Sequence, residues 1–128
     1  REIVFSNKEK LKNLENIIHP YIIKEIEDKI NEKKTEFKHI VVDAPLLYET
    51  GLDEIVEQVW VVAARRSIQL KRIVKRDLIS KSAANKRIES QMSLEKKKEL
   101  ADYVIINEGT LSELKSKVFK KWKKINQL

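Results

Sequence analysis

Three short apolar runs, separated by helical patterns, constrain the fold of this 128-residue chain more than any other feature. The first run, residues 40–42, is rich in β-branched side chains and leads into Asp43 and Pro45. Continuous apolar runs of this kind are typical of strands buried on both faces of a parallel sheet. Proline cannot donate to a strand ladder, so we expect the strand to end here with Asp43 at its carboxyl end.

Two further apolar runs, at residues 59–63 and 103–106, predict two more strands. Apolar residues at helical spacing predict helices over residues 68–75, 81–90, 94–100 and from 111 to the end of the chain. Ser80 and Ser93 fit helix N-caps, and Thr110 with Glu113 fits a capping box. This alternation of strands and helices indicates an α/β layered fold.

A helical region is also expected before the first strand. Ser6 and Glu9 have the spacing of a capping box that opens a helix. His19-Pro20 interrupts the pattern, because proline disfavours a helical residue before it. We therefore expect two helices, or one sharply bent helix, within residues 1–36.

The composition limits the kinds of molecule that this chain is expected to bind. With 27 Lys and Arg against 20 Asp and Glu, the net charge of +7 favours anionic partners, either nucleic acid or phosphorylated small molecules. The absence of cysteine excludes a disulfide framework and thiolate chemistry, and two separated histidines do not provide a zinc site. No apolar run approaches the ~20 residues needed to span a bilayer.

Glycine is scarce, and this bears on phosphate binding. A phosphate-cradling loop needs closely spaced glycines followed by Lys-Ser or Lys-Thr, and neither Gly51 nor Gly109 has that context. The chain begins at Arg1, its only methionine is Met92, and three strands are few for a doubly wound sheet. We therefore expect amino-terminal strands and a P-loop to belong to a longer protein and to be absent from this chain.

Basic residues gather in residues 65–98, which contain twelve Lys and Arg and three acidic residues. Arg72 and Arg76 lie one helical turn apart, and Arg87 and Gln91 have the same spacing. Guanidinium groups bind phosphate oxygens in pairs, which favours polyphosphate recognition. A solvated helix surface is the alternative.

Two other residues have two interpretations each. Asp43 is either a Mg²⁺-binding or nucleophile-positioning group, as in phosphoryl-transfer proteins, or the cap of a turn. His19 is either an acid–base or ligand-contacting group, or a local hydrogen-bonding residue beside Pro20.

Several segments in one order carry a resemblance to a known family. They are residues 3–5, 19–20, 42–52, 69–72, 76–77, 87–92, 97, 101–102 and 104–107 with Gly109. Residues 42–52 read V-D-A-P-L-L-Y-E-T-G-L, close to the D-x-P-L-L-F-E-x-G-L pattern of dephospho-coenzyme A kinases. The chain resembles about the carboxyl-terminal two thirds of that family. It departs from the pattern at Tyr48, where phenylalanine is usual, and at residues 108–110.

The resemblance implies a P-loop NTPase-like fold, a three-layer α/β/α parallel sheet with a helical acceptor region and a lid. It assigns residues 1–39 to the acceptor-binding region and residues 40–76 to core strands and helices. Residues 77–98 become the lid, and residues 99–128 become a core strand and the carboxyl-terminal helix.

The resemblance also implies an activity for the complete enzyme. That enzyme transfers the γ-phosphate of ATP, with Mg²⁺, to the 3′-hydroxyl of dephospho-coenzyme A in the cytoplasm, the last step of coenzyme A biosynthesis. This chain alone is expected to be inactive, because the P-loop and the general base precede Arg1. We expect small-molecule substrates and no membrane or nucleic-acid partner, and assembly of identical copies is left open.

Site residues follow from the same resemblance, and no metal ligand is assigned. Residues expected on the acceptor side are His19, Leu46, Leu47, Tyr48 and Glu49. Residues expected to bind ATP are Arg76, Arg87, Gln91, Asn107 and Gly109. Catalytic roles are expected for Arg87 and, in a supporting electrostatic sense, for Asp43.

Two other classes of protein stay open. One is a different P-loop kinase for small molecules or nucleoside monophosphates, which should have a different acceptor region. The other is a basic nucleic-acid-binding module, against which the three buried-type strands and the lack of exposed aromatic stacking motifs count.

Overall fold

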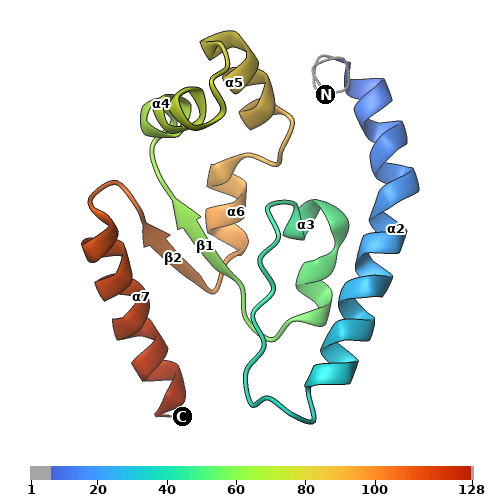
Figure 1. Cartoon of the computed structure of the whole chain (residues 1–128), viewed down its shortest axis with the longest axis vertical. Coiled ribbons are helices and arrows are strands. Elements are labelled where there is room, and N and C mark those ends of the chain that lie inside the picture. The colour runs from blue at the N-terminus through green and yellow to red at the C-terminus, as the bar shows by residue number, and fades with distance from the viewer. Residues whose placement is uncertain (1–6, 128) are drawn as a thin grey trace. The chain divides into compact units, whose positions relative to one another are not determined.

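The structure, a computed structural model, describes residues 7–127 of the chain (Figure 1). It divides into two compact units. The first contains the described parts of Arg1–Glu57 together with Lys86–Met92, and the second contains Gln58–Asn85 with the described part of Ser93–Leu128. The predicted match at residues 3–5 lies outside the described residues.

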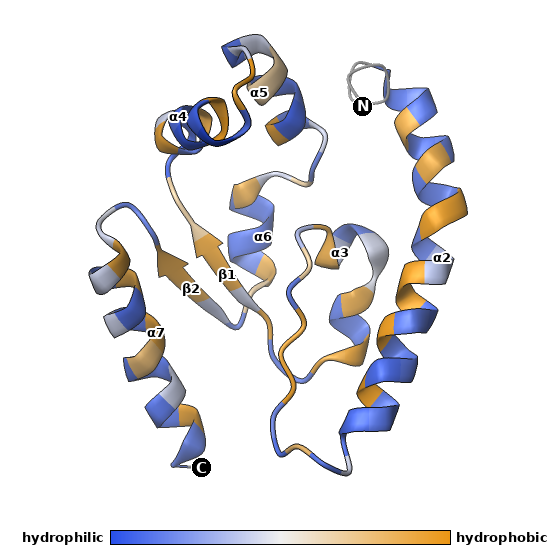
Figure 2. Cartoon of the chain, in the orientation of Figure 1, coloured by the Kyte–Doolittle hydropathy of each residue, from blue (hydrophilic) through white to orange (hydrophobic). Residues whose placement is uncertain are grey.

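A parallel two-stranded sheet forms the centre of the second unit. Strands β1 (Trp60–Ala63) and β2 (Tyr103–Ile106) pair in parallel, with Trp60 opposite Tyr103 and Ala63 opposite Ile106. Both strands are hydrophobic over most of their length (Figure 2), and their side chains Val61, Ala63 and Ile105 are buried. The prediction of an α/β fold with a parallel sheet is confirmed, and β1 begins one residue later than predicted.

Four helices follow in the sequence order expected. They are α4 (Arg66–Asp77), α5 (Lys81–Glu89), α6 (Leu94–Leu100) and α7 (Leu111–Asn126). Of these, α6 contacts β1 and α7 contacts β2. The Ser93 hydroxyl accepts the Lys96 N–H at 3.2 Å, and Thr110 and Glu113 form the predicted capping box at the start of α7. Helix α5 begins in the second unit, and its last residues belong to the first.

A single long helix, α2 (Lys8–Lys33), opens the first unit and contains Pro20 in its interior. The predicted break at His19-Pro20 is wrong. Proline removes one helical hydrogen bond, the one its N–H would make to the carbonyl of Asn16. Both Asn16 and Pro20 are exposed, so water can hydrate that carbonyl and the helix continues.

The start of α2 also differs from the expectation. Asn7 is the N-cap, and its side-chain oxygen accepts the N–H groups of Glu9 and Lys10 at 3.1 Å each. The predicted capping residue, Ser6, lies outside the described residues. Because the helix begins one residue later than predicted, Glu9 does not occupy the third helical position that a capping box requires.

Residues 40–43 do not form the strand that the apolar run predicts. They lie in an irregular segment of the first unit, and both strands of the described chain belong to the second unit. Val41 is 82% exposed. A buried parallel strand exists only where a neighbouring strand completes its hydrogen bonds, and an apolar pattern does not supply that neighbour.

The segment after this run forms a compact helical turn. Helix α3 (Leu47–Thr50) ends at Gly51, whose φ of +78° is accessible to glycine at little cost. A 3₁₀ turn, η1 (Leu52–Ile55), follows and places Leu52 in the core at 1% exposure. Gly51 thus joins two turns that surround the most deeply buried large side chain of the unit.

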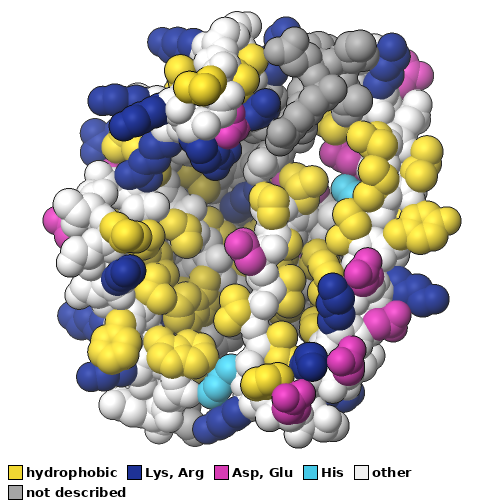
Figure 3. Space-filling model, in the orientation of Figure 1, with side chains coloured by type: hydrophobic (Ala, Val, Ile, Leu, Met, Phe, Trp, Pro, Cys, Tyr) yellow, Lys and Arg dark blue, Asp and Glu magenta, His cyan; other side chains and the backbone are white. Residues whose placement is uncertain are grey.

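Large apolar side chains remain on the surface of the first unit. Hydrophobic groups line α2 (Figure 3), and Ile17 and Tyr21 are among the most exposed of them. Within residues 7–127, none of the helices combines the length and the apolar character that a membrane span needs.

Candidate functional site

The predicted acceptor-side residues Leu46, Leu47, Tyr48 and Glu49 form the entrance and first turn of α3, with half-buried side chains. The Thr50 hydroxyl donates to the carbonyl of Leu46 at 2.8 Å and fixes this turn. A carboxylate oxygen of Glu49 accepts the backbone N–H of Met92 at 3.0 Å. This bond brings the acceptor-side turn into contact with the segment that carries Arg87 and Gln91, 43 residues away in sequence.

His19 and Asp43 also belong to the first unit. His19 is half-buried near the middle of α2, and Asp43 is exposed in the irregular segment before α3. The sequence predicted that Asp43 lies at the carboxyl end of a strand. This prediction is wrong, because no strand forms at residues 40–43. Its exposed carboxylate is accessible to a hydrated ion or to a turn donor.

Arg87 lies in the last turn of α5 with a half-buried side chain, and its carbonyl accepts the Ser90 hydroxyl at 2.7 Å. The helix ends at Glu89, so Gln91 is not on the same helix, contrary to the expectation from their spacing. The Gln91 N–H instead donates to the carbonyl of Ile88 at 3.3 Å in a turn. Arg87 is therefore fixed by a helix, while Gln91 is fixed by a turn.

The carboxyl ends of β1 and β2 carry a charged cluster in the second unit. The Glu108 carboxylate accepts three hydrogen bonds from Arg65, one from the backbone N–H at 2.6 Å and two from the guanidinium at 3.0 and 3.2 Å. The side-chain hydrogen bond from Arg65 is the largest cause that lowers the pKa of Glu108, followed by the backbone hydrogen bond. Sequence reasoning missed Arg65 and Glu108, since neither position has a distinctive pattern.

The arginines predicted for polyphosphate recognition have protein acceptors. Arg72 donates to the backbone carbonyl of Asn107 at 2.6 Å. Arg76 forms a two-bond ion pair with its neighbour Asp77 at 2.8 and 3.0 Å, and this hydrogen bonding raises the pKa of Arg76. A phosphate group at Arg76 would compete with Asp77.

Gly109 has a structural reason to be glycine. A Cβ atom built at this position would collide with the carboxylate of Glu113, which is held there by the Thr110 N–H at 2.8 Å. The capping box of α7 therefore needs the space that glycine leaves. Contact of Gly109 with a nucleotide stays a prediction.

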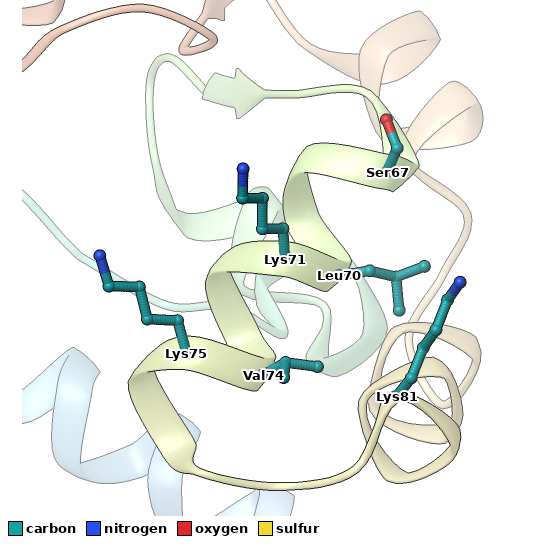
Figure 4. A pocket seen from close by; sticks show the side chains of 6 residues that line it. All are labelled: Ser67, Leu70, Lys71, Val74, Lys75 and Lys81. Carbon is teal, nitrogen blue, oxygen red and sulfur yellow. The ribbon is translucent and has the colours of Figure 1, made fainter.

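An open groove of about 500 Å³ lies along α4 and the start of α5 (Figure 4). Leu70 and Val74 face Lys81 across it, while Lys71 and Lys75 extend from α4 in another direction (Figure 4). Because the ammonium groups do not converge, the groove does not form a phosphate cradle. Among residues 7–127, no cluster of three His, Asp or Glu side chains could hold a metal ion.

Comparison with known proteins places these features in a family. The family model described as dephospho-CoA kinase matches residues 1–113. A dephospho-CoA kinase of Fusobacterium nucleatum is 45% identical over 118 residues, covering 92% of this chain and 60% of the relative. One of Carboxydothermus hydrogenoformans is 41% identical over 126 residues, covering 95% of this chain and 61% of the relative.

A solved structure gives the same result. The dephospho-CoA kinase from Campylobacter jejuni superposes with a TM-score of 0.64 at 36% identity, covering 98% of this chain and 63% of that protein. The chain spans about 60% of the length of the curated relatives it matches.

Proposed function

Because the chain belongs to the dephospho-CoA kinase family, we propose that it is part of a kinase that phosphorylates the 3′-hydroxyl of dephospho-coenzyme A with ATP. The observation that supports this most is the family match over residues 1–113, which includes the acceptor-side turn and the segment around Arg87. The complete protein would carry out the last step of coenzyme A biosynthesis, in the cytoplasm.

The phosphate cradle of such an enzyme would come from outside these 128 residues. Gly51 ends α3 and Gly109 makes room for Glu113, and the two glycines are too far apart to form a phosphate-cradling loop. A Mg²⁺ ion in a kinase is bound by one or two carboxylates, substrate phosphates and water. Asp43, with its exposed carboxylate, fits a position next to that hydrated ion.

The acceptor side would be built by the first unit. The apolar side chains of Leu46, Leu47 and Tyr48 would contact dephospho-coenzyme A, and His19 would offer it a hydrogen bond. Glu49 would act indirectly, because its carboxylate holds the backbone of Met92. We propose that this bond couples the acceptor-side turn to the lid, residues 77–98, and within it to Arg87 and Gln91.

The remaining nucleotide contacts would be Arg76, Asn107 and Gly109 in the second unit. Asn107 directly follows β2, and ligands of α/β sheets bind beyond the carboxyl ends of the strands. Residues 40–76 and 99–128 would form the core that carries this edge. Residues 1–39 would bind the acceptor.

The test uses a full-length protein that contains this segment. We expect it to convert dephospho-coenzyme A to coenzyme A in the presence of ATP and Mg²⁺, with one ADP released per product, measured by liquid chromatography. Nucleoside monophosphates serve as competing acceptors. Phosphorylation of AMP or CMP in preference to dephospho-coenzyme A would reject the proposal, and so would salt-sensitive RNA binding without kinase activity.

A substitution at Asp43 tests its proposed electrostatic role. Asp43→Asn keeps the side-chain volume and removes one charge, so in the full-length enzyme turnover should fall by about 10²-fold or more. The folded state should be little affected, because the carboxylate is exposed. Steady-state kinetics over a range of Mg²⁺ concentrations, with a thermal melt, measure both. Unchanged turnover together with a large fall in Tm would indicate a turn-capping role instead.

A further inference from the structure

Two arginines attach the loop at residues 107–109 to the rest of the second unit. Arg65 lies in the β1–α4 connection and Arg72 lies in α4. Arg65, the N-cap residue of α4, binds the Glu108 carboxylate with its backbone N–H and its guanidinium. Arg72, two turns into the same helix, donates to the carbonyl of Asn107. The loop after β2 is thereby joined to the residues that follow β1.

Both backbone groups of Asn107 are already hydrogen-bonded within the second unit. The Asn107 N–H extends the sheet by donating to the Ala63 carbonyl at 2.7 Å, and the Asn107 carbonyl is bound by Arg72. The Thr110 N–H is bound by Glu113. The side-chain amide of Asn107 makes no hydrogen bond with the residues that the structure describes, so it retains its donors and its acceptor for a ligand.

We propose that Arg65 and Glu108 form a clamp that positions Asn107 for recognition of the adenine nucleotide; this inference rests on the proposed function. Neither residue of the clamp is expected to touch ATP. Their role is to join the carboxyl ends of two parallel strands, so that the amide of Asn107 is presented in one orientation. A preorganised polar group binds its ligand more tightly because less conformational freedom is lost on binding.

The geometry of the pair distinguishes it from an ordinary surface ion pair. Most exposed ion pairs hold two flexible side chains in high dielectric and contribute little. Here both guanidinium bonds meet one carboxylate, and a backbone N–H adds a third bond that does not depend on a side-chain rotamer. The Glu108 side chain is only 24% exposed, compared with 70% for that of Arg65.

The experiment is a double-mutant cycle in a full-length enzyme that contains this segment. Arg65→Gln, Glu108→Gln and the double variant are compared with wild type for the Kd of mant-ATP and for the KM and kcat of the kinase reaction. We expect each single variant to raise the Kd and the ATP KM about tenfold, with kcat and the KM for dephospho-coenzyme A within about twofold of wild type. The double variant should bind ATP no more weakly than either single variant, because each single substitution already removes the same Arg65–Glu108 interaction.

Two further variants make the result specific. Arg65→Lys keeps the charge and loses the fork, so it should recover only part of the ATP affinity. Glu99→Gln breaks the exposed Lys96–Glu99 ion pair on α6 and serves as a matched control with no expected change. The clamp is rejected if the singles leave the ATP affinity unchanged, or if both KM values and Tm shift together as in general destabilisation.

The design separates the clamp from the proposed function. A wild-type protein that binds mant-ATP but fails to phosphorylate dephospho-coenzyme A would reject the proposed function alone. The mant-ATP affinities of the three variants would still accept or reject the clamp.

Discussion

The 128-residue chain, purified by itself, is expected to release no ADP when it is mixed with ATP, dephospho-coenzyme A and Mg²⁺. Phosphoryl transfer depends on backbone N–H groups and a lysine that hold the β- and γ-phosphates. Closely spaced glycines permit that arrangement, and this chain has two glycines, 58 positions apart at Gly51 and Gly109. Both are used for structure, one as the left-handed end of α3 and the other as space for the Glu113 carboxylate.

A coupled assay for ADP measures this prediction, with the full-length protein as the positive control. The full-length protein should show dephospho-coenzyme A-dependent turnover under the same conditions, because it would add the phosphate cradle. Host kinases are a source of false activity, so the chain should be compared with a sample of its Arg87→Ala variant purified in the same way. Turnover by the chain that exceeds this background would contradict the prediction and the assignment of the cradle to another segment.

The elements that the sequence predicts well are those whose signals are local. The strand at Tyr103–Ile106 and the helix at Leu94–Leu100 have the predicted bounds. The capping box of α7 forms between two residues three positions apart, and the structure reproduces it. Each of these features depends on neighbouring residues, which a sequence displays directly.

The failures have non-local causes. Residues 40–43 have the composition of a buried strand, but a strand forms only with a hydrogen-bonding neighbour, and composition does not reveal one. Pro20 was expected to end a helix on local grounds, yet the carbonyl that loses its hydrogen bond is on an exposed residue that water can hydrate, and the helix continues. In both cases the surroundings of the segment outweigh its own preference.

In the candidate site, as in the fold, the sequence does not reveal contacts between residues that are far apart along the chain. The spacing of Arg72 and Arg76 suggested polyphosphate recognition, which stays a prediction. The structure adds protein acceptors that this spacing does not reveal, the Asn107 carbonyl for Arg72 and Asp77 for Arg76. The acceptor of Arg72 lies 35 residues away in sequence, and that of Arg65 lies 43 residues away. Such partners depend on how β1 and β2 pair, which the helical spacing of arginines does not encode.

Arg87 is the residue for which we expect the largest effect of a single substitution in the full-length enzyme. Its side chain projects from the last turn of α5, so a helix limits its orientation, and it is half-buried. A guanidinium can bind two oxygens of the transferring phosphate and strengthen those bonds as charge develops in the transition state. Removing such an arginine lowers turnover by about 10³-fold or more, so we expect Arg87→Ala to be nearly inactive.

Arg87→Lys separates charge from geometry. Lysine keeps one positive charge but cannot form the fork, so turnover should stay about 10²-fold below wild type. The fall in kcat should exceed the rise in the ATP KM, since the interaction is strongest in the transition state. Steady-state kinetics with varied ATP measure both quantities.

Lys81→Ala and Lys86→Ala provide the matched controls, because both lysines lie on α5 and are exposed. Each removes one positive charge from the same helix, so both report any general effect of charge on nucleotide binding. We expect their kcat to remain near wild type, since a lysine ammonium is a point charge that cannot form the two-bond fork of a guanidinium. If Arg87→Lys equals wild type, or if all three positions weaken ATP binding to the same extent, Arg87 belongs to a diffuse basic surface and has no specific role at the transferring phosphate.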